Sequence, residues 1–324
     1  MGRASLFIML LITISFNQKG YCDGFVNIGG IHLKTIPNDP DPVFDVNTVT
    51  VPIKRAGNLI IVEAQIDTTE GNFVLDTGAP YLVLNATYFR YMPKIADQDA
   101  GGINGASGGT FTTVVNNFSI LDLHYPRLTA DVTDLSNIEN GRHIKILGLL
   151  GTRLFAKMAI TIDLAHGVLY IHKLDNRGNI APNERLFDHP QLKTAFKYIN
   201  EIIYLKGSIE DKTMWFAFDT GAEVNLLDYR GSKKIIQKMT VINRQKLTGV
   251  GGAEFEIINA KIDKLMVADV VFYHNRMLMT SLERMGNFYG QSVDAILGHD
   301  FFSRGIFTIN FVKKEFEMYI YNNQ

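Results

Sequence analysis

The sequence predicts an all-β fold in which two similar β-barrel lobes face each other across a pseudo-twofold axis. Three observations lead to this prediction: the chain repeats itself once, its apolar residues are spaced as in strands, and an Asp-Thr-Gly triplet follows an apolar cluster in each copy. Apolar alternation and short apolar clusters of about four to eight residues are typical of strands rather than helices. The chain of 324 residues is long enough to bury the cores of two such lobes.

The internal repeat is the most informative feature of the chain. Phe73 to Ala79 lies against Phe216 to Ala222 at an offset of 143 (219 − 76). Leu149 to Phe155 lies against Ile296 to Phe302 at an offset of 147 (298 − 151), which indicates a four-residue insertion in the second copy. Two units of about 125 residues indicate a duplicated lobe, because a solenoid needs three or more shorter units.

The repeat and the composition together predict the domain boundaries. The two copies define a first lobe over residues 51–174 and a second over 199–324. Residues 175–198 begin with a polar stretch that holds glycine and two prolines, which is typical of a linker. Residues 23–50 form an N-terminal extension, and residues 1–22 precede it as a signal peptide.

The first 22 residues predict export from the cytoplasm. A basic start at Arg3 is followed by an apolar run from Leu6 to about Phe16, as in a secretory signal peptide; a buried N-terminal helix is the alternative. No later segment approaches about 18 consecutive apolar residues, so no membrane span is predicted. Cys22 is the only cysteine, which excludes an intramolecular disulfide and leaves a lipid anchor at this residue open. We expect a secreted or periplasmic protein.

The overall charge points to no nucleic acid partner. The formal net charge is -1, from 32 basic and 33 acidic residues, and no block of like charge stands out. The eight histidines are scattered without the spacing of metal ligands. We therefore expect neither a metal nor another cofactor.

The two aspartates of the repeated triplet, Asp76 and Asp219, are the candidate catalytic residues. Hydrolysis of an amide by water needs a base to activate the water and an acid to protonate the leaving nitrogen. Two carboxyl groups facing each other across the axis supply both, because like-charge repulsion makes them share one proton. The pair titrates as a unit, so the sequence does not assign the proton to either residue.

The residues after each aspartate are expected to support the two active-site loops. Thr77 and Thr220 have hydroxyls that can tie the loops together. Gly78 and Gly221 lack side chains, so the backbone can approach the carboxyl groups closely.

The order of motifs in each half resembles that of the retropepsin-like aspartic peptidases (clan AA), the family of the retroviral proteases and their bacterial relatives. Each half carries Asp-Thr-Gly-Ala, a glycine-rich segment, and an apolar-apolar-Gly triplet such as Leu149 to Gly151, and the resemblance covers residues 50 to 322. It implies a two-lobed acid-protease fold of the bacterial type. Because one chain carries both lobes, it also implies an active monomer.

The resemblance also implies two glycine-rich flaps that close over a bound peptide. The first segment is longer than the second, which departs from strict symmetry, and ordinary flexible hairpins are the alternative. The flap and substrate-binding candidates are Gly101, Gly102, Gly105, Gly108, Gly109, Gly249, Gly251 and Gly252.

The sequence thus predicts an aspartic endopeptidase that acts on an extended polypeptide. A binding module on the same fold, which holds peptides or a protein without cutting them, is the alternative. A phosphoryl-transfer enzyme with a nucleophilic aspartate is disfavoured, because no further carboxylate or basic group lies close to Asp76 in sequence.

Overall fold

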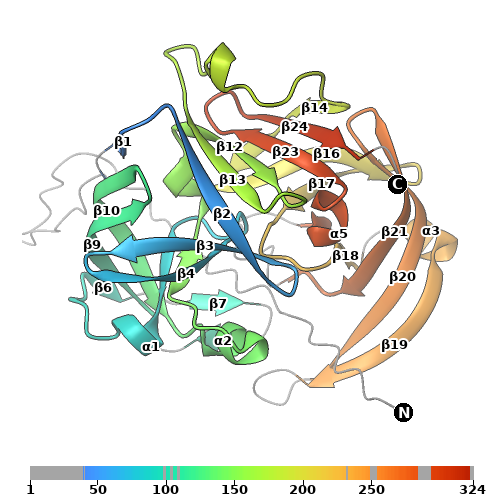
Figure 1. The fold of residues 1–324 in the computed structure, drawn as a ribbon. Helices are drawn as coiled ribbons and strands as arrows, with labels where there is room; N and C mark the ends of the chain where they lie inside the picture. The colour runs from blue at the N-terminus through green and yellow to red at the C-terminus, as the bar shows by residue number, and fades with distance from the viewer. Residues whose placement is uncertain are drawn as a thin grey trace, which may run out of the picture.

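The structure of the protein is a computed structural model, and its description covers most of the chain beyond the N-terminal region. The described residues are 39, 41–97, 100–102, 105–107, 110–230, 233–248, 254–283 and 293–321. The predicted signal peptide, the candidate lipid site Cys22 and much of the predicted extension therefore lie outside them. Strands dominate and the helices are short, so the predicted all-β class is confirmed (Figure 1). No helix within these ranges is long and apolar enough to cross a membrane.

A closed six-stranded barrel forms the first part of the fold. Its strand order is β3-β4-β11-β5-β10-β9, and β9 pairs with β3 to close the ring. Two short strands attach to it, since β6 extends β9 and β1 pairs with β10, while β7 and β8 pair only with each other. The bounds are β1 (Val43–Phe44), β3 (Leu59–Ile66), β4 (Thr69–Leu75), β5 (Leu82–Asn85), β6 (Ala96–Asp97), β7 (Ala100–Gly102), β8 (Gly105–Ser107), β9 (Phe111–Ile120), β10 (Leu123–Thr133) and β11 (Gly148–Leu150).

A second sheet is built from later residues. Its order is β15-β16-β17-β22-β18-β21-β20-β19, and β16 also pairs with β20. The long strands β19, β20 and β21 curve along the outer side of the molecule (Figure 1). The bounds are β15 (Lys197–Ile199), β16 (Ile202–Ile209), β17 (Lys212–Phe218), β18 (Leu226–Asp228), β19 (Thr240–Thr248), β20 (Glu254–Val267), β21 (Val270–Thr280) and β22 (Ala295–Leu297).

Six further strands, which we call the shared sheet, continue the strand order of the barrel. Its order is β14-β24-β23-β12-β13-β2, and β2 continues into the barrel through its pairing with β3. The early strand β12 pairs antiparallel with the late strand β23, so both ends of the chain contribute to one layer (Figure 1). The bounds are β2 (Thr48–Ala56), β12 (Met158–Asp163), β13 (Val168–Lys173), β14 (Leu192–Ala195), β23 (Gly305–Asn310) and β24 (Glu315–Ile320).

Short helices connect the strands. Asn85 caps the first of them, because its side chain accepts a hydrogen bond from the backbone N–H of Thr87. The segment predicted as a linker, residues 175–198, holds a 3-10 helix and β14. The helices are α1 (Ala86–Phe89), α2 (Ser136–Arg142), η1 (Thr152–Phe155), η2 (Pro182–Glu184), α3 (Lys233–Lys238) and α5 (His299–Phe302).

The core fixes the ends of two strands that matter below, β4 and β17. Phe73 and Leu75 of β4 are fully buried, as is Phe218 at the end of β17. The Phe218 ring packs against Phe316 of the shared sheet with ring centroids 5.1 Å apart. Burial of such a side chain stabilises the fold by about 1.5–3 kcal/mol. Each strand end is therefore held rigidly where the chain leaves the core.

Candidate active site

Asp76 and Asp219 occupy equivalent positions directly after β4 and β17. In each case a neighbouring parallel strand fixes the backbone: Asp76 donates its N–H to Leu150 O of β11 (3.0 Å), and Asp219 donates its N–H to Leu297 O of β22 (3.0 Å). The parallel pairing brings a second apolar strand beside each aspartate. Both residues thus leave the core on a loop that starts at a fixed point.

The two loops are joined through the threonines next to the aspartates. Thr77 Oγ1 accepts the N–H of Thr220 (2.9 Å) and donates to Phe218 O (2.9 Å). Thr220 Oγ1 accepts the N–H of Thr77 (3.0 Å) and donates to Leu75 O (2.7 Å). Both threonines are buried, so these four hydrogen bonds are shielded from water.

The glycines of the two triplets allow the carboxyl groups to meet. Gly78 donates its N–H to Asp76 Oδ1 (2.9 Å), and Gly221 donates its N–H to Asp219 Oδ1 (2.7 Å). A Cβ at Gly78 would lie 2.5 Å from Asp219 Oδ2, and one at Gly221 would lie 2.6 Å from Asp76 Oδ1. Each carboxyl group therefore stands against the glycine of the opposite loop, where no side chain would fit.

Burial governs the protonation of this pair. Asp76 and Asp219 are only 6% and 1% exposed. Burial raises the pKa of Asp76 to about 6, against the opposing effect of its hydrogen bonds with Asp219, Gly78 and Ala79. Burial and then the charge of Asp76 raise the pKa of Asp219 well above its ordinary value. Over a range of pH the pair therefore shares a single proton.

The surroundings of one carboxyl oxygen of the pair are consistent with a shared proton. Asp219 Oδ2 is buried and receives no hydrogen bond from any donor in the described part of the chain. The carboxyl group of Asp76 is its interaction partner. A proton held between the two carboxyl groups satisfies this oxygen, whereas two ionised groups would leave it without a donor.

The structure describes three of the eight predicted flap glycines. Gly101 and Gly102 lie in β7 and Gly105 lies in β8, where Gly102 pairs with Gly105. The flap role of all eight stays a prediction. The other five lie outside the described residues: Gly108, Gly109, Gly249, Gly251 and Gly252.

Metal-binding side chains do not gather around the pair. Across the described ranges, no group of three or more His, Cys, Asp or Glu side chains is arranged to hold a metal ion.

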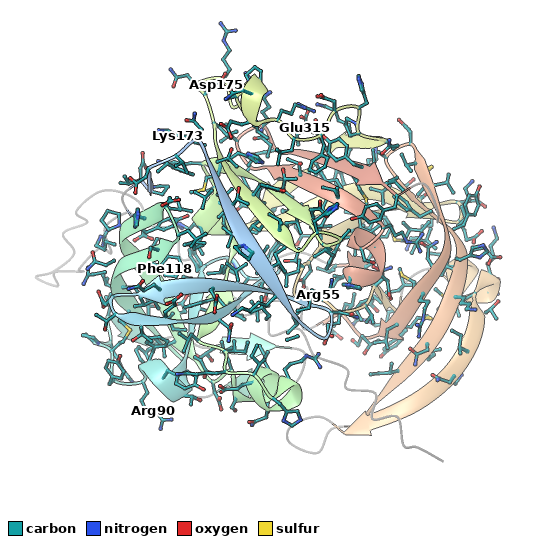
Figure 2. All side chains as sticks on the ribbon, in the orientation of Figure 1. Arg55, Arg90, Phe118, Lys173, Asp175 and Glu315 are labelled. Carbon is teal, nitrogen blue, oxygen red and sulfur yellow. The ribbon has the colours of Figure 1, made fainter. Side chains whose placement is uncertain are left out.

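Two further contacts connect the first half of the chain to the second. Arg55, at the end of β2 beside α5 (Figure 2), donates to His299 Nε2 (2.8 Å). Tyr198 of β15 donates its hydroxyl to Thr152 Oγ1 (3.1 Å). Burial and then the charge of Arg55 lower the pKa of His299 to about 4, so the neutral ring accepts this hydrogen bond at neutral pH.

Sequence reasoning missed a group of residues beside the Asp219 loop. Glu223 forms an ion pair with Arg142, the last residue of α2, and accepts the backbone N–H of Asn58 (3.1 Å). The repeat contained a usable signal, because the two copies differ at this position: Glu223 in the second copy aligns with Pro80 in the first (80 + 143). Nothing in the sequence pointed to Arg142, since only the fold brings α2 to this loop.

Comparisons with known proteins show the fold alone. No family model matches the chain, and no curated protein matches its sequence. Conglutin gamma, described as a unique basic 7S globulin from lupine seeds, is similar in structure with a TM-score of 0.50 and 8% identity, over 83% of this chain and 94% of that one. Basic 7S globulin from soybean gives a TM-score of 0.48 and 10% identity, over 85% and 94%.

The resemblance to the retropepsin-like aspartic peptidases is therefore corrected. The structural neighbours are seed globulins, and no family model supports that assignment, so it was wrong. The physical reason lies in what the motifs encode. Asp-Thr-Gly and the apolar-apolar-Gly triplet specify two tight loops that approach each other closely, a local requirement that identifies a geometry and not a family.

Proposed function

We propose that this protein is an aspartic endopeptidase that hydrolyses peptide bonds with a water molecule activated by Asp76 and Asp219. The observation that carries the proposal is the buried pair of carboxyl groups, each standing against the glycine of the opposite loop. Raised pKa values make one proton and one negative charge available side by side. This is the combination of acid and base that amide hydrolysis by water requires.

The difference between the two aspartates suggests their roles. Asp76, whose pKa is raised to about 6, acts as the base and takes a proton from water while the water oxygen attacks the carbonyl carbon. Asp219 holds the proton and donates it to the carbonyl oxygen, which gives a neutral tetrahedral diol. The diol then collapses: one hydroxyl returns its proton to the Asp219 carboxylate, Asp76 gives its proton to the leaving nitrogen, and the C–N bond breaks.

We further propose that the molecule consists of two lobes related by a pseudo-twofold axis. The closing pairs β3–β9 and β16–β20 occupy corresponding places in the barrel and the second sheet, which supports this relation. So does the pairing of Thr161 with Thr308, because these residues are equivalent in the repeat (161 + 147) and their hydroxyls are 2.8 Å apart. One chain would then carry a complete site and act as a monomer.

We propose an extended polypeptide as the substrate, held by backbone hydrogen bonds as an added strand. The predicted signal peptide, residues 1–22, is the basis for proposing that the protein works as a secreted or periplasmic enzyme.

Cleavage of a mixed peptide library by purified residues 23–324, from acid to neutral pH, tests the proposal. We expect the wild type to cut, and the Asp76→Asn and Asp219→Asn variants to lose cleavage by about 1,000-fold or more, because each lacks half of the acid–base pair. Asp163→Asn is the matched control: Asp163 is equally buried but bonds to His166 in the shared sheet. Uncut peptides with a folded wild type would overturn the proposal in favour of a binding module.

A further inference from the structure

A buried ion pair links the Asp219 loop to the barrel side of the molecule. Glu223 follows Asp219 by four residues (223 − 219), and Ala222 between them donates its N–H to Asp219 O (3.3 Å). The Glu223 carboxylate pairs with Arg142 of α2, and both side chains are largely buried, at 13% and 12% exposed. The loop that carries Asp219 is therefore held by a charged group of the opposite half of the chain.

The turn between β2 and β3 completes this contact. Asn58 donates its backbone N–H to Glu223 Oε2 (3.1 Å) and its side-chain amide to Glu223 O (3.2 Å). Gly57 has φ +65, and a Cβ there would lie 3.1 Å from Glu223 Oε2. Glycine at this position allows the turn to come close to the carboxylate.

Among the described residues, the Asp76 loop has no equivalent of this ion pair. Its corresponding residue is Pro80 (223 − 143), whose carbonyl oxygen accepts the N–H of Arg153 (3.0 Å) from the same half of the chain. The Asp219 loop is thus held in place by a charge from across the molecule, whereas Pro80 carries no charge.

We propose that Arg142 is a positioning residue that acts through Glu223 to hold the Asp219 carboxyl group at the place where it shares a proton with Asp76. The inference rests on the proposed function and deepens it, since it names what keeps the acid–base pair together. Removing the guanidinium leaves a buried carboxylate without its counter-charge, and such a group moves toward water or takes up a proton. The first response pulls the Asp219 loop away from Asp76, and the second removes the charge that ties the loop to α2.

The variant Arg142→Met tests the proposal through kinetics and pH dependence. We expect kcat for peptide cleavage to fall by about 100-fold with KM changed by less than about threefold, because the loss is one of alignment and not of substrate contacts. We also expect the alkaline side of the pH profile to move to lower pH, since separated carboxyl groups repel each other less and the second of them ionises more easily. Arg142→Lys keeps the charge and is expected to recover most of kcat.

Two further variants separate positioning from stability. Arg185→Met breaks an ion pair with the buried Glu317 in the shared sheet, away from the aspartates, and is expected to leave the pH profile unchanged. In the double variant Arg142→Met/Glu223→Gln no charge is left without a partner, so a folded loop is expected even if the single variant unfolds. A wild-type kcat and pH profile in folded Arg142→Met would overturn the proposal.

A second readout keeps this inference distinct from the proposed function. Carbon-13 NMR of labelled aspartate carboxyl groups follows the titration of Asp76 and Asp219 without any substrate. We expect Arg142→Met to lower the upper titration midpoint of the pair toward ordinary carboxyl values, whether or not the wild type cuts peptides. Unchanged midpoints would refute the role of Arg142, whereas shifted midpoints in a wild-type protein that cuts no peptide would refute the proposed function alone.

Discussion

At the scale of single residues, burial of Asp76 favours the proposed chemistry and disfavours the folded state. Its pKa rises from 3.8 to about 6 on folding, so the folded protein binds more protons than the unfolded chain between these values. The contribution of protonated Asp76 to stability is therefore fully present below about pH 4 and is lost as the pH rises through 6. The shift corresponds to a cost of about 3 kcal/mol at neutral pH.

The variant Asp76→Asn should remove this cost. We expect it to be more stable than the wild type by about 1–3 kcal/mol at pH 7, since a neutral amide still accepts the N–H of Gly78, and to show little difference near pH 4. Urea unfolding at both pH values measures the difference. An equal gain at the two pH values would mean that the buried charge is not its cause.

The hydroxyl of Thr220 provides a second test at this scale. Thr220→Val keeps the shape but leaves the N–H of Thr77 and the carbonyl of Leu75 without their partner inside the protein. We expect a loss of about 2–4 kcal/mol in the free energy of unfolding, because each unsatisfied buried group costs about 1–3 kcal/mol. Thr220→Ser restores the hydroxyl and should recover most of this loss in urea unfolding. Equal losses in both variants would assign the effect to packing instead.

The sequence pointed to some of these residues and not to others for a physical reason. Asp76 and Asp219 stand in a repeated triplet, so two copies of one pattern revealed them. Glu223 stood out only as a difference between the two copies and Arg142 not at all, because their ion pair depends on how α2 is placed against the opposite loop. A contact between distant segments leaves a trace in a single sequence only when both partners follow a local rule.

At the scale of elements, a buried histidine joins the strands of the shared sheet. His172 of β13 contacts Thr48 of β2 (3.0 Å) and Thr161 of β12 (3.1 Å), and Thr161 in turn bonds to Thr308 of β23. Burial lowers the pKa of His172 to about 4, against the opposing charge of Glu184. The folded state therefore favours the neutral ring. The contribution of the neutral His172 ring to stability is fully present above about pH 6.5 and is lost as the pH drops toward 4.

His172→Gln should make the protein less sensitive to acid. Between pH 6.5 and 4 we expect the wild type to lose about 2–3 kcal/mol more than this variant in urea unfolding, because glutamine keeps a polar side chain that does not titrate. His189→Gln, a change at an exposed residue of the 175–198 segment, is the control. A wild type and a His172→Gln variant with parallel losses would show that other groups cause the acid sensitivity.

The strands themselves were easier to predict than their pairing. Six consecutive buried residues in β12, and the alternation of buried and exposed residues in β2, follow from apolar patterning that the sequence displays. The pairing of β12 with β23 could not be predicted from such patterns, because the apolar pattern of a strand does not determine which strand lies beside it. For the same reason β14 lay unnoticed in a segment whose polar composition is typical of a linker.

At the scale of the whole molecule, strands from both halves of the chain form one sheet. The shared sheet takes β2, β12 and β13 from the first half and β23 and β24 from the second. The rings of Phe155 and Phe311, one from each half, stack with centroids 6.4 Å apart in a core that contains residues of both. Each half alone would expose a strand edge and an apolar face to water.

Cutting the covalent connection tests how far this mutual dependence goes. We insert a protease recognition sequence after Asp188, which is exposed, and cleave the folded protein there. We expect the two pieces to elute together from a sizing column at the size of the intact chain, because the β12–β23 pairing and the Thr77–Thr220 hydrogen bonds remain. The uncut insertion variant is the control. Two folded pieces that elute separately would show that the halves are independent domains. Each half would then fold without the strands that the other half contributes to the shared sheet.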